Sequence, residues 1–289
     1  MRAIRFIINS NFLIALAAFS LALATEVELG ISPHFQAYLV LIFLATLSDY
    51  NLHRIIAVYK NPDVINVEKF RWAAEHLILL KILMLFSLAG QAISMFFVKS
   101  VILYILAPLA LLSLLYSIPF QGKQKKQSSL LRIPGIKTFL IATVWTTATV
   151  ILPVLQSGIS INNTSVFLIF AERFAFIFAI AIPFDIRDMK ADALAGIRTI
   201  PVTFGEKRAL LVSNSMMGIS LAIALFHYLA QNMIFIFIAY SVSIALTLIF
   251  INSRKIKDYP IYYHGILDGS IMLHGLLISL SIFLSFLTA

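Results

Sequence analysis

The sequence predicts an all-α, polytopic membrane protein, on the evidence of its composition, the length of its apolar runs and the placement of its charges. Of the 289 residues, 61% are hydrophobic and 12% are charged, and the mean hydropathy is +0.96. A soluble domain is closer to half apolar and a quarter charged. Apolar runs of roughly 18 residues or more, long enough to cross a bilayer, recur along the chain. A membrane β-barrel would instead show short alternating strands.

We expect nine transmembrane helices in one bundle, and residues 1–289 to form a single domain, because no soluble segment or linker interrupts the apolar runs. The first run has a basic start, but no small-residue cleavage site follows it before Glu26, so we expect a retained span rather than a signal peptide. The expected spans are residues 7–24, 35–50, 72–92, 97–118, 136–157, 164–184, 209–229, 232–251 and 265–287.

The charges of the loops alternate. Nearly all of the 22 basic residues fall in the N-terminus and every second loop, whereas the opposite set holds Lys99 with Glu26 and Glu28. The positive-inside rule therefore places the N-terminus and the basic loops in the cytoplasm and the C-terminus on the opposite side, and we expect a bacterial inner (plasma) membrane. The net charge of +9 thus indicates contact with membrane lipids rather than nucleic acid. The chain has no cysteine, which excludes disulfides and thiol chemistry.

Acidic residues are scarce, yet three of the thirteen lie close together in residues 184–205, which read FDIRDMKADALAGIRTIPVTFG. On a helix, Asp185, Asp188 and Asp192 lie at about 0°, 300° and 340°, so the three carboxylates share one face. Like charges so close repel one another unless a cation lies among them. Hard oxygen ligands of this kind suit Mg²⁺, which usually also binds phosphate oxygens.

Basic residues surround this aspartate cluster. Arg187, Lys190 and Arg198 are close enough in sequence to bind the oxygens of a diphosphate by charge-assisted hydrogen bonds. The alternative is a solvated helix end on which the acids only balance the neighbouring basic side chains. We favour the metal and diphosphate site, because the carboxylates are few, in phase and placed where a span ends.

The stretch resembles the second aspartate-rich motif of the UbiA superfamily of intramembrane prenyltransferases. The match runs from the three aspartates through a set of spaced residues: Gly196, Thr199, Pro201, Val202 and Gly205. The resemblance implies a helical bundle around a central cavity, in which two such motifs hold Mg²⁺ and a prenyl diphosphate. It also implies that Asp185 and Asp188 are catalytic and, with Asp192, bind the metal. Ionisation of the donor would give an allylic cation that an acceptor captures.

The first motif of this superfamily, Asn-Asp-x-x-Asp-x-x-x-Asp, belongs after the second span. Here residues 47–55 read LSDYNLHRI. Asp49 matches and takes the implied catalytic and metal-binding role, but Ser48 replaces the asparagine, and Leu52 and Ile56 replace the later acids. This departure leaves several outcomes open: a changed donor, a single metal ion, weak activity or none.

Neighbouring polar residues could compensate for the missing acids. Asn51 offers a neutral oxygen ligand, and His53 and Arg54 could bind phosphate directly. The alternative for His53 and Arg54 is an interfacial pair that sets the topology.

A second basic loop also resembles the superfamily. Residues 116–127 read YSIPFQGKQKKQ, and the resemblance assigns Tyr116, Lys123 and Lys126 to diphosphate binding or to capping of the cavity. The alternative is an ordinary positive-inside loop.

Three functions remain open. The first is a Mg²⁺-dependent membrane prenyltransferase that moves an isoprenyl group from a prenyl diphosphate to a lipophilic acceptor, for example an aromatic one. The second is a catalytically impaired relative that binds an isoprenoid or anionic lipid. The third is a transporter, for which the intramembrane Glu172, Arg173 and Asp268 would mark a pathway. Helix geometry separates Glu172 from Arg173 by about 100°, so we expect the partners of both on other helices.

Overall fold

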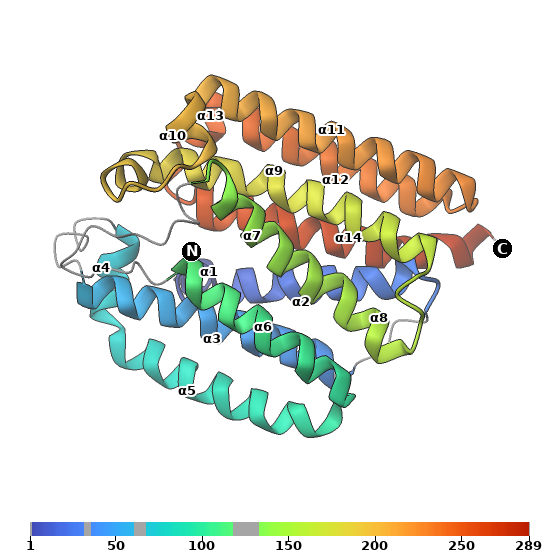
Figure 1. Cartoon of the computed structure of the whole chain (residues 1–289), viewed down its shortest axis with the longest axis horizontal. Helices are drawn as coiled ribbons and strands as arrows, with labels where there is room; N and C mark the ends of the chain where they lie inside the picture. Colours follow the sequence, from blue (N-terminus) through green and yellow to red (C-terminus); the bar gives the residue numbers. More distant parts are fainter. Residues whose placement is uncertain (1, 32–35, 61–67, 118–132, 289) are drawn as a thin grey trace.

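The computed structural model describes residues 2–31, 36–60, 68–117 and 133–288, and these residues form helices and turns without any strand (Figure 1). The first half contains α1 (Arg2–Asn9), α2 (Phe12–Glu28), α3 (Ala37–Lys60), α4 (Glu68–Glu75), α5 (Leu77–Ser94), η2 (Met95–Phe97) and α6 (Ser100–Ser117). The second half contains α7 (Ile136–Thr146), η4 (Thr147–Ile151), α8 (Leu152–Ser157), α9 (Thr164–Leu194), α10 (Ile200–Phe204), α11 (Glu206–Ala230), α12 (Ile234–Asn252), α13 (Arg254–Lys257), η5 (Tyr262–Leu267) and α14 (Asp268–Thr288).

The helices confirm an integral membrane protein of the predicted class. Among the described residues, seven helices are long and apolar enough to cross a membrane, and α1 with α2 would make an eighth if this bent pair is one span. The segment Ser100–Ser113 of α6 is a shorter apolar helix in the place of the fourth predicted span. The predicted number of nine is therefore approximate. The central cavity that the resemblance implies stays a prediction.

The first predicted span is broken. Its two parts, α1 and α2, meet at an angle of 73°. The break lies at Asn11, which has a left-handed backbone (φ 66°) that asparagine tolerates better than most residues. The Asn11 side chain is buried and donates a hydrogen bond from Nδ2 to Asn51 Oδ1 of α3 (2.8 Å). The bend is thus held by a contact with another helix, which the local sequence does not reveal.

Two helices continue past the predicted ends of their spans. We expected loops over residues 51–71 and 185–208, but α3 runs to Lys60 and α9 runs to Leu194. No proline or glycine interrupts either extension, so the backbone hydrogen bonds continue. The chain leaves α9 at Gly196, whose φ of 72° favours glycine, and Ile197 N donates to Asp192 O (2.8 Å) to close the helix.

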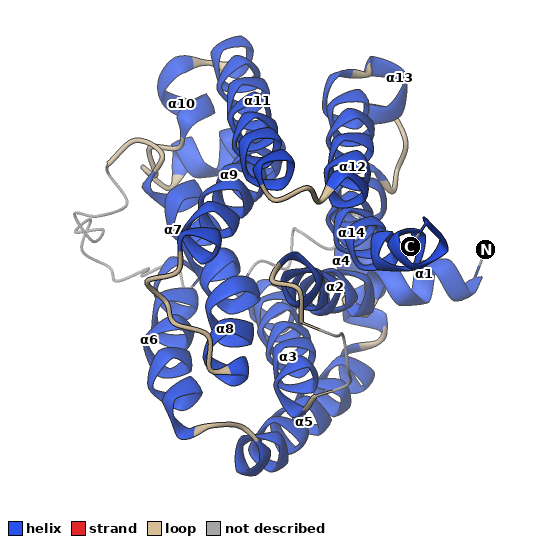
Figure 2. Cartoon of the chain, turned by 90° about the vertical axis from the view of Figure 1, so that its right-hand side faces the viewer, coloured by secondary structure: helices blue, strands red, loops and turns tan. Residues whose placement is uncertain are grey.

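The long helices run side by side, and most are seen nearly end-on in Figure 2. Helix α9 packs against α7, α10 and α11, and α2 packs against α3 and α14. The contact between α2 and α14 is close, because a Cβ atom at Gly275 would lie 2.5 Å from the backbone carbon of Ser20. Helices α3 and α9 both end on the left of Figure 1, and we call this end of the bundle the aspartate end. The opposite end is called the far end.

Candidate functional site

Helices α3 and α9 bring the candidate residues to the aspartate end of the bundle (Figure 1). Helix α3 carries residues 49–54, and α9 carries residues 185–192. Asp268 is the first residue of α14, and its negative charge acts on a residue of each set, because it attracts the guanidinium groups of both Arg54 and Arg187. Polar groups from three helices that are distant in sequence therefore share one environment.

The second motif is organised around Lys137, in the first turn of α7. Its Nζ lies 3.3 Å from Asp185 Oδ1 and 3.0 Å from Asp192 Oδ2. The neighbouring Thr138 Oγ1 donates a hydrogen bond to Asp185 Oδ2 (2.5 Å), and the charge of Asp188 also attracts the Lys137 ammonium, though less than the other two aspartates do. Asp185 and Asp192 thus face one cation, as expected of two carboxylates on one helix face.

Asp188 is held by its neighbour Arg187 through two parallel hydrogen bonds. Arg187 Nε donates to Asp188 Oδ1 (2.7 Å) and Nη2 donates to Oδ2 (2.8 Å). The guanidinium also lies over the rings of Phe184 and Tyr263, 5.3 and 5.0 Å from their centroids, and Nη1 is 3.1 Å from His264 Nε2. Such bidentate and stacked contacts fix the plane of an arginine. Both members of this pair remain about one third exposed, so an incoming anion or metal can reach them.

In the first motif, Asp49 is contacted by a serine and a histidine. Ser113 Oγ of α6 donates to Asp49 Oδ2 (2.8 Å). His53 Nε2 lies 3.2 Å from Asp49 Oδ1, which is close enough for an ion pair but is not aligned for a hydrogen bond. The Asp49 side chain is one quarter exposed, so this carboxylate also remains accessible.

The same motif contains hydrogen-bond donors without acceptors. Asn11 connects two of its residues, since its Nδ2 donates to Asn51 Oδ1 and its Oδ1 accepts from Arg54 Nη2. Asn51 and Arg54 are both buried, and Asn51 Nδ2 and Arg54 Nη1 have no partner among the described residues. A buried donor without an acceptor is costly, and the guanidinium is charged. This part of the site is therefore suited to bind an anion directly.

A pre-assembled metal cage is absent from the described part of the chain: no three His, Cys, Asp or Glu side chains there are grouped so that they could hold a metal ion. Magnesium does not require such a cage, because it is usually bound by one or two carboxylates together with substrate phosphates and water. That mode of binding fits the carboxylate oxygens of the two motifs, which belong to Asp49, Asp185, Asp188 and Asp192. The two motifs therefore fit a metal that arrives with a phosphate.

The other predicted residues are less informative. Lys190 and Arg198 are exposed, and no contact joins their side chains to the three aspartates in the part that the structure describes. Lys123 and Lys126 lie outside the described residues, and only the backbone of Tyr116 is described, within α6. The roles proposed for these five residues stay predictions.

Sequence reasoning missed the residues that bind the motifs from other helices. Lys137 looks like any basic residue at the start of a span, and Thr138 and Ser113 look like ordinary polar residues within one. Asn11 lies in an apolar run with no neighbouring charge. Among these partners, only Asp268 could be singled out from the sequence, because an acidic residue within a predicted span is unusual.

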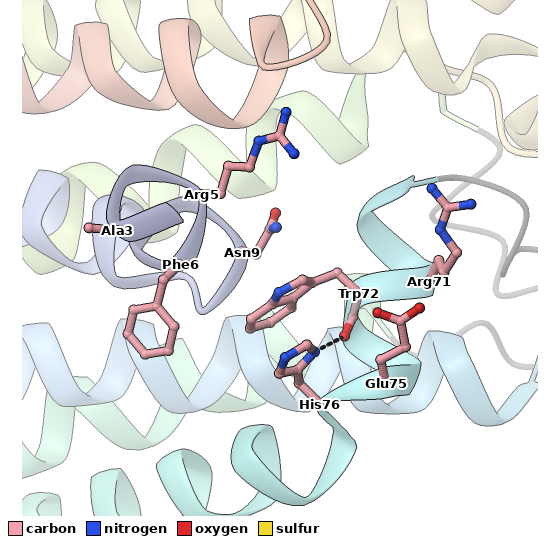
Figure 3. A pocket seen from close by; sticks show the side chains of 8 residues that line it. All are labelled: Ala3, Arg5, Phe6, Asn9, Arg71, Trp72, Glu75 and His76. Carbon is pink, nitrogen blue, oxygen red and sulfur yellow. Dashed lines mark hydrogen bonds between the residues drawn. The ribbon is translucent and has the colours of Figure 1, made fainter. Parts of the chain in front are cut away.

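Two hollows lie outside the motifs. One, of about 590 Å³, lies between α1 and α4 and is lined by Ala3, Arg5, Phe6, Asn9, Arg71, Trp72, Glu75 and His76 (Figure 3). There the rings of Trp72 and His76 stack at 4.3 Å, and Phe6 meets Trp72 edge-on. The other, of about 540 Å³, is an apolar groove between α12 and α14. Neither hollow is lined by an aspartate of the two motifs.

Comparison with known proteins gives a consistent picture. A family model described as the UbiA prenyltransferase family matches residues 74–260. A solved structure of a UbiA homolog from Archaeoglobus fulgidus is 16% identical, covers 95% of this chain and 98% of its own, and has a TM-score of 0.62. The same homolog bound to GPP and Mg²⁺ is 17% identical, with coverages of 94% and 99% and a TM-score of 0.61.

An apo UbiA homolog from Aeropyrum pernix K1 is 18% identical, covers 93% of this chain and 98% of its own, and has a TM-score of 0.60. At such low identity these structures support the fold alone. No curated protein matches the chain significantly.

Proposed function

Since this chain belongs to the UbiA prenyltransferase family, we propose that it transfers a prenyl group from a prenyl diphosphate to a lipophilic acceptor within the membrane, with the help of Mg²⁺. The observation that carries the proposal is the pair of buried, unpaired donors, Asn51 Nδ2 and Arg54 Nη1, on the same helix as the accessible Asp49. Donors of this kind suit the oxygens of a diphosphate. The homolog described as bound to GPP and Mg²⁺ supports the same donor class.

The two motifs would bind the diphosphate in different ways. Arg54 and Asn51 would donate hydrogen bonds to its oxygens, and His53 would approach it from the surface of α3. In this arrangement Asn11 is a positioning residue, because it accepts from Arg54 and donates to Asn51 and so orients both. Direct hydrogen bonds would thus take the place of the metal ligands that the side chains of Leu52 and Ile56 cannot provide.

The second motif would supply the metal site. Magnesium held by Asp185, Asp188, Asp192 and Asp49 would neutralise the negative charge that develops on the departing diphosphate. Arg187 would add its charge from the exposed side of α9, held flat by Phe184. Lys190 and Arg198 remain candidates for the outer phosphate oxygens.

The reaction would begin with heterolytic cleavage of the bond between the allylic carbon and the diphosphate oxygen, whose electron pair leaves with the diphosphate. Fixed donors that face the developing charge stabilise this step more than they stabilise the bound substrate. A nucleophilic carbon or oxygen of the acceptor would then bond to the allylic cation and lose its proton.

The test is a release assay. The protein is purified in detergent and supplied with allylic diphosphates of several chain lengths, Mg²⁺, and membrane lipid extract as a source of acceptors. We expect release of diphosphate, with a loss of at least ~100-fold in an Asp185→Ala/Asp188→Ala variant. The matched control is Asp258→Ala, an exposed aspartate at the end of α13, which should retain full activity. Undiminished release by the double variant would overturn the assignment of these aspartates.

The second candidate function is a family relative that binds an isoprenoid or anionic lipid without turnover. It is favoured by Leu52 and Ile56 in the first motif and by the engagement of Asp185 and Asp192 with Lys137. In the same experiment, saturable binding of a prenyl diphosphate without any release would support this candidate. Absence of binding at every chain length would contradict both and favour the transporter.

A further inference from the structure

A second polar cluster lies deep in the membrane domain, toward the far end of the bundle and away from the two motifs. It contains Glu28 of α2, Glu172 and Arg173 of α9, and Tyr228 of α11, and each of these side chains is at most 1% exposed. The sequence predicted that Glu172 and Arg173 would find partners on other helices, and the structure confirms it. The cluster contains two carboxyl groups but a single guanidinium.

Arg173 is paired with Glu28. Its Nη2 lies 3.0 Å from Glu28 Oε1 and 2.7 Å from Oε2, and its Nη1 donates to the backbone oxygen of Leu21 (2.9 Å). Both oxygens of Glu28 thus face the positive charge of the guanidinium. Glu28 and Arg173 neutralise one another, and Glu172 is left without a counter-ion.

The hydroxyl of Tyr228 lies between the two carboxyl groups. It is 3.0 Å from Glu28 Oε1 and also makes a short contact with Glu172 Oε1. A phenol has one hydrogen, so it can donate to only one of the two oxygens. If Glu172 were ionised, one contact would bring two oxygen lone pairs together with no hydrogen between them. A proton on Glu172 provides the missing hydrogen.

The neighbouring groups provide neither that hydrogen nor another charge. Ser220 donates to the backbone oxygen of Glu172 (2.8 Å), so the hydroxyl of Tyr240 must donate to Ser220 (2.6 Å). On the next helices, Ser243 donates to the backbone oxygen of Tyr240 (2.6 Å), so His274 Nδ1 donates to Ser243 (2.6 Å). His274 Nε2 then has no partner in the described structure, as expected of a neutral imidazole.

The burial of Glu172 also favours a protonated side chain. Its Oε2 has no hydrogen-bond partner among the described residues. An ionised carboxylate with an unpaired oxygen is very costly in an apolar interior, whereas the carbonyl oxygen of a neutral acid costs much less.

We infer that Glu172 is a proton-binding site within the membrane and carries a proton in the folded protein. The hydrogen bonds then run in one direction: Glu172 donates to Tyr228, Tyr228 donates to Glu28, and Glu28 accepts from Arg173. Both contacts of the Tyr228 hydroxyl then contain a hydrogen, and the cluster has no net charge. The cluster is separate from the proposed diphosphate site, and its hydrogen bonds join α2, α9 and α11 at membrane depth.

The direct test is infrared spectroscopy of the full-length protein in detergent at neutral pH. A protonated carboxyl group shows a carbonyl stretch that is distinct from that of a carboxylate and shifts in heavy water. We expect such a band in the unchanged protein and its loss in Glu172→Gln. The control Glu206→Gln, which removes an exposed carboxylate at the start of α11, should keep the band. Absence of the band from the unchanged protein, or its persistence in Glu172→Gln, would overturn the inference.

Thermal unfolding provides a second readout. Glutamine preserves a neutral donor and acceptor, so Glu172→Gln should melt close to the unchanged protein. Glu28→Gln removes the counter-ion of Arg173 and should lower the melting temperature by roughly 10 °C or prevent folding. A loss in Glu172→Gln as large as that in Glu28→Gln would show that Glu172 is ionised and would contradict the inference. Neither readout depends on enzymatic activity.

Discussion

Lys137 is the residue through which the second motif depends on another helix. Its ammonium group contacts Asp185 and Asp192, whose side chains are 3% and 9% exposed, and is itself 19% exposed. An ion pair at the surface contributes little, whereas removing one partner of a buried pair costs several kcal/mol, because the other charge is left unpaired. Because Lys137 is partly exposed and its partners are buried, we expect the cost of removing it to lie between these two values.

We therefore predict that Lys137→Met lowers the free energy of unfolding by about 2 kcal/mol in metal-free buffer. We also predict that Mg²⁺ restores more stability to this variant than to the unchanged protein, since the metal can occupy the position between the two carboxylates. Thermal unfolding with and without Mg²⁺ measures both effects. Lys207→Met, which removes an exposed lysine in the first turn of α11, is the control. An equal response to Mg²⁺ in both proteins would show that Lys137 does not occupy a cation position.

At the scale of elements, the contact between α2 and α14 depends on a residue without a side chain. A Cβ atom at Gly275 would lie 2.5 Å from Ser20 C and 2.7 Å from Leu21 N, and both of these atoms belong to the backbone. Backbone atoms cannot turn aside as a flexible side chain can. The two helices would have to separate, and α2 also provides Leu21 O to Arg173.

Gly275→Ala should therefore destabilise the fold by about 1–3 kcal/mol, the usual cost of overpacking. The same helix offers a matched control in Gly269, where a Cβ atom would meet nothing within 4 Å. Gly269→Ala should be neutral or slightly stabilising, because alanine favours helix by up to about 1 kcal/mol over glycine. Unfolding midpoints of the two variants in the same detergent provide the comparison, and equal midpoints would argue against a tight contact.

At the scale of the whole molecule, the fold could be predicted further than the site. Apolar runs identify membrane helices locally, because each run must satisfy its own backbone hydrogen bonds in lipid. The spacing of Asp185, Asp188 and Asp192 likewise predicts a shared face from helix geometry alone. The bend at Asn11 and the position of Lys137 depend on contacts between helices, and no periodicity within one segment reports them. This is why the acids of the motif were predictable and their basic partner was not.

The charges of the loops predict an orientation in the membrane, and on that basis we propose that the aspartate end faces the cytoplasm. The chain has no cysteine, so single cysteines can be introduced without removing others. Lys207→Cys marks the aspartate end at the start of α11, and Asn162→Cys marks the far end before α9; both positions are exposed.

A membrane-impermeant maleimide applied to intact bacterial cells should label Asn162→Cys, and should label Lys207→Cys only after the cells are opened. The cysteine-free parent, which should remain unlabelled in both conditions, is the control. The reverse pattern would place the proposed diphosphate site outside the cell, where the basic loops would contradict the positive-inside rule. Because prenyl diphosphates are charged and do not cross a bilayer unaided, that outcome would also require the donor to be supplied from the outside.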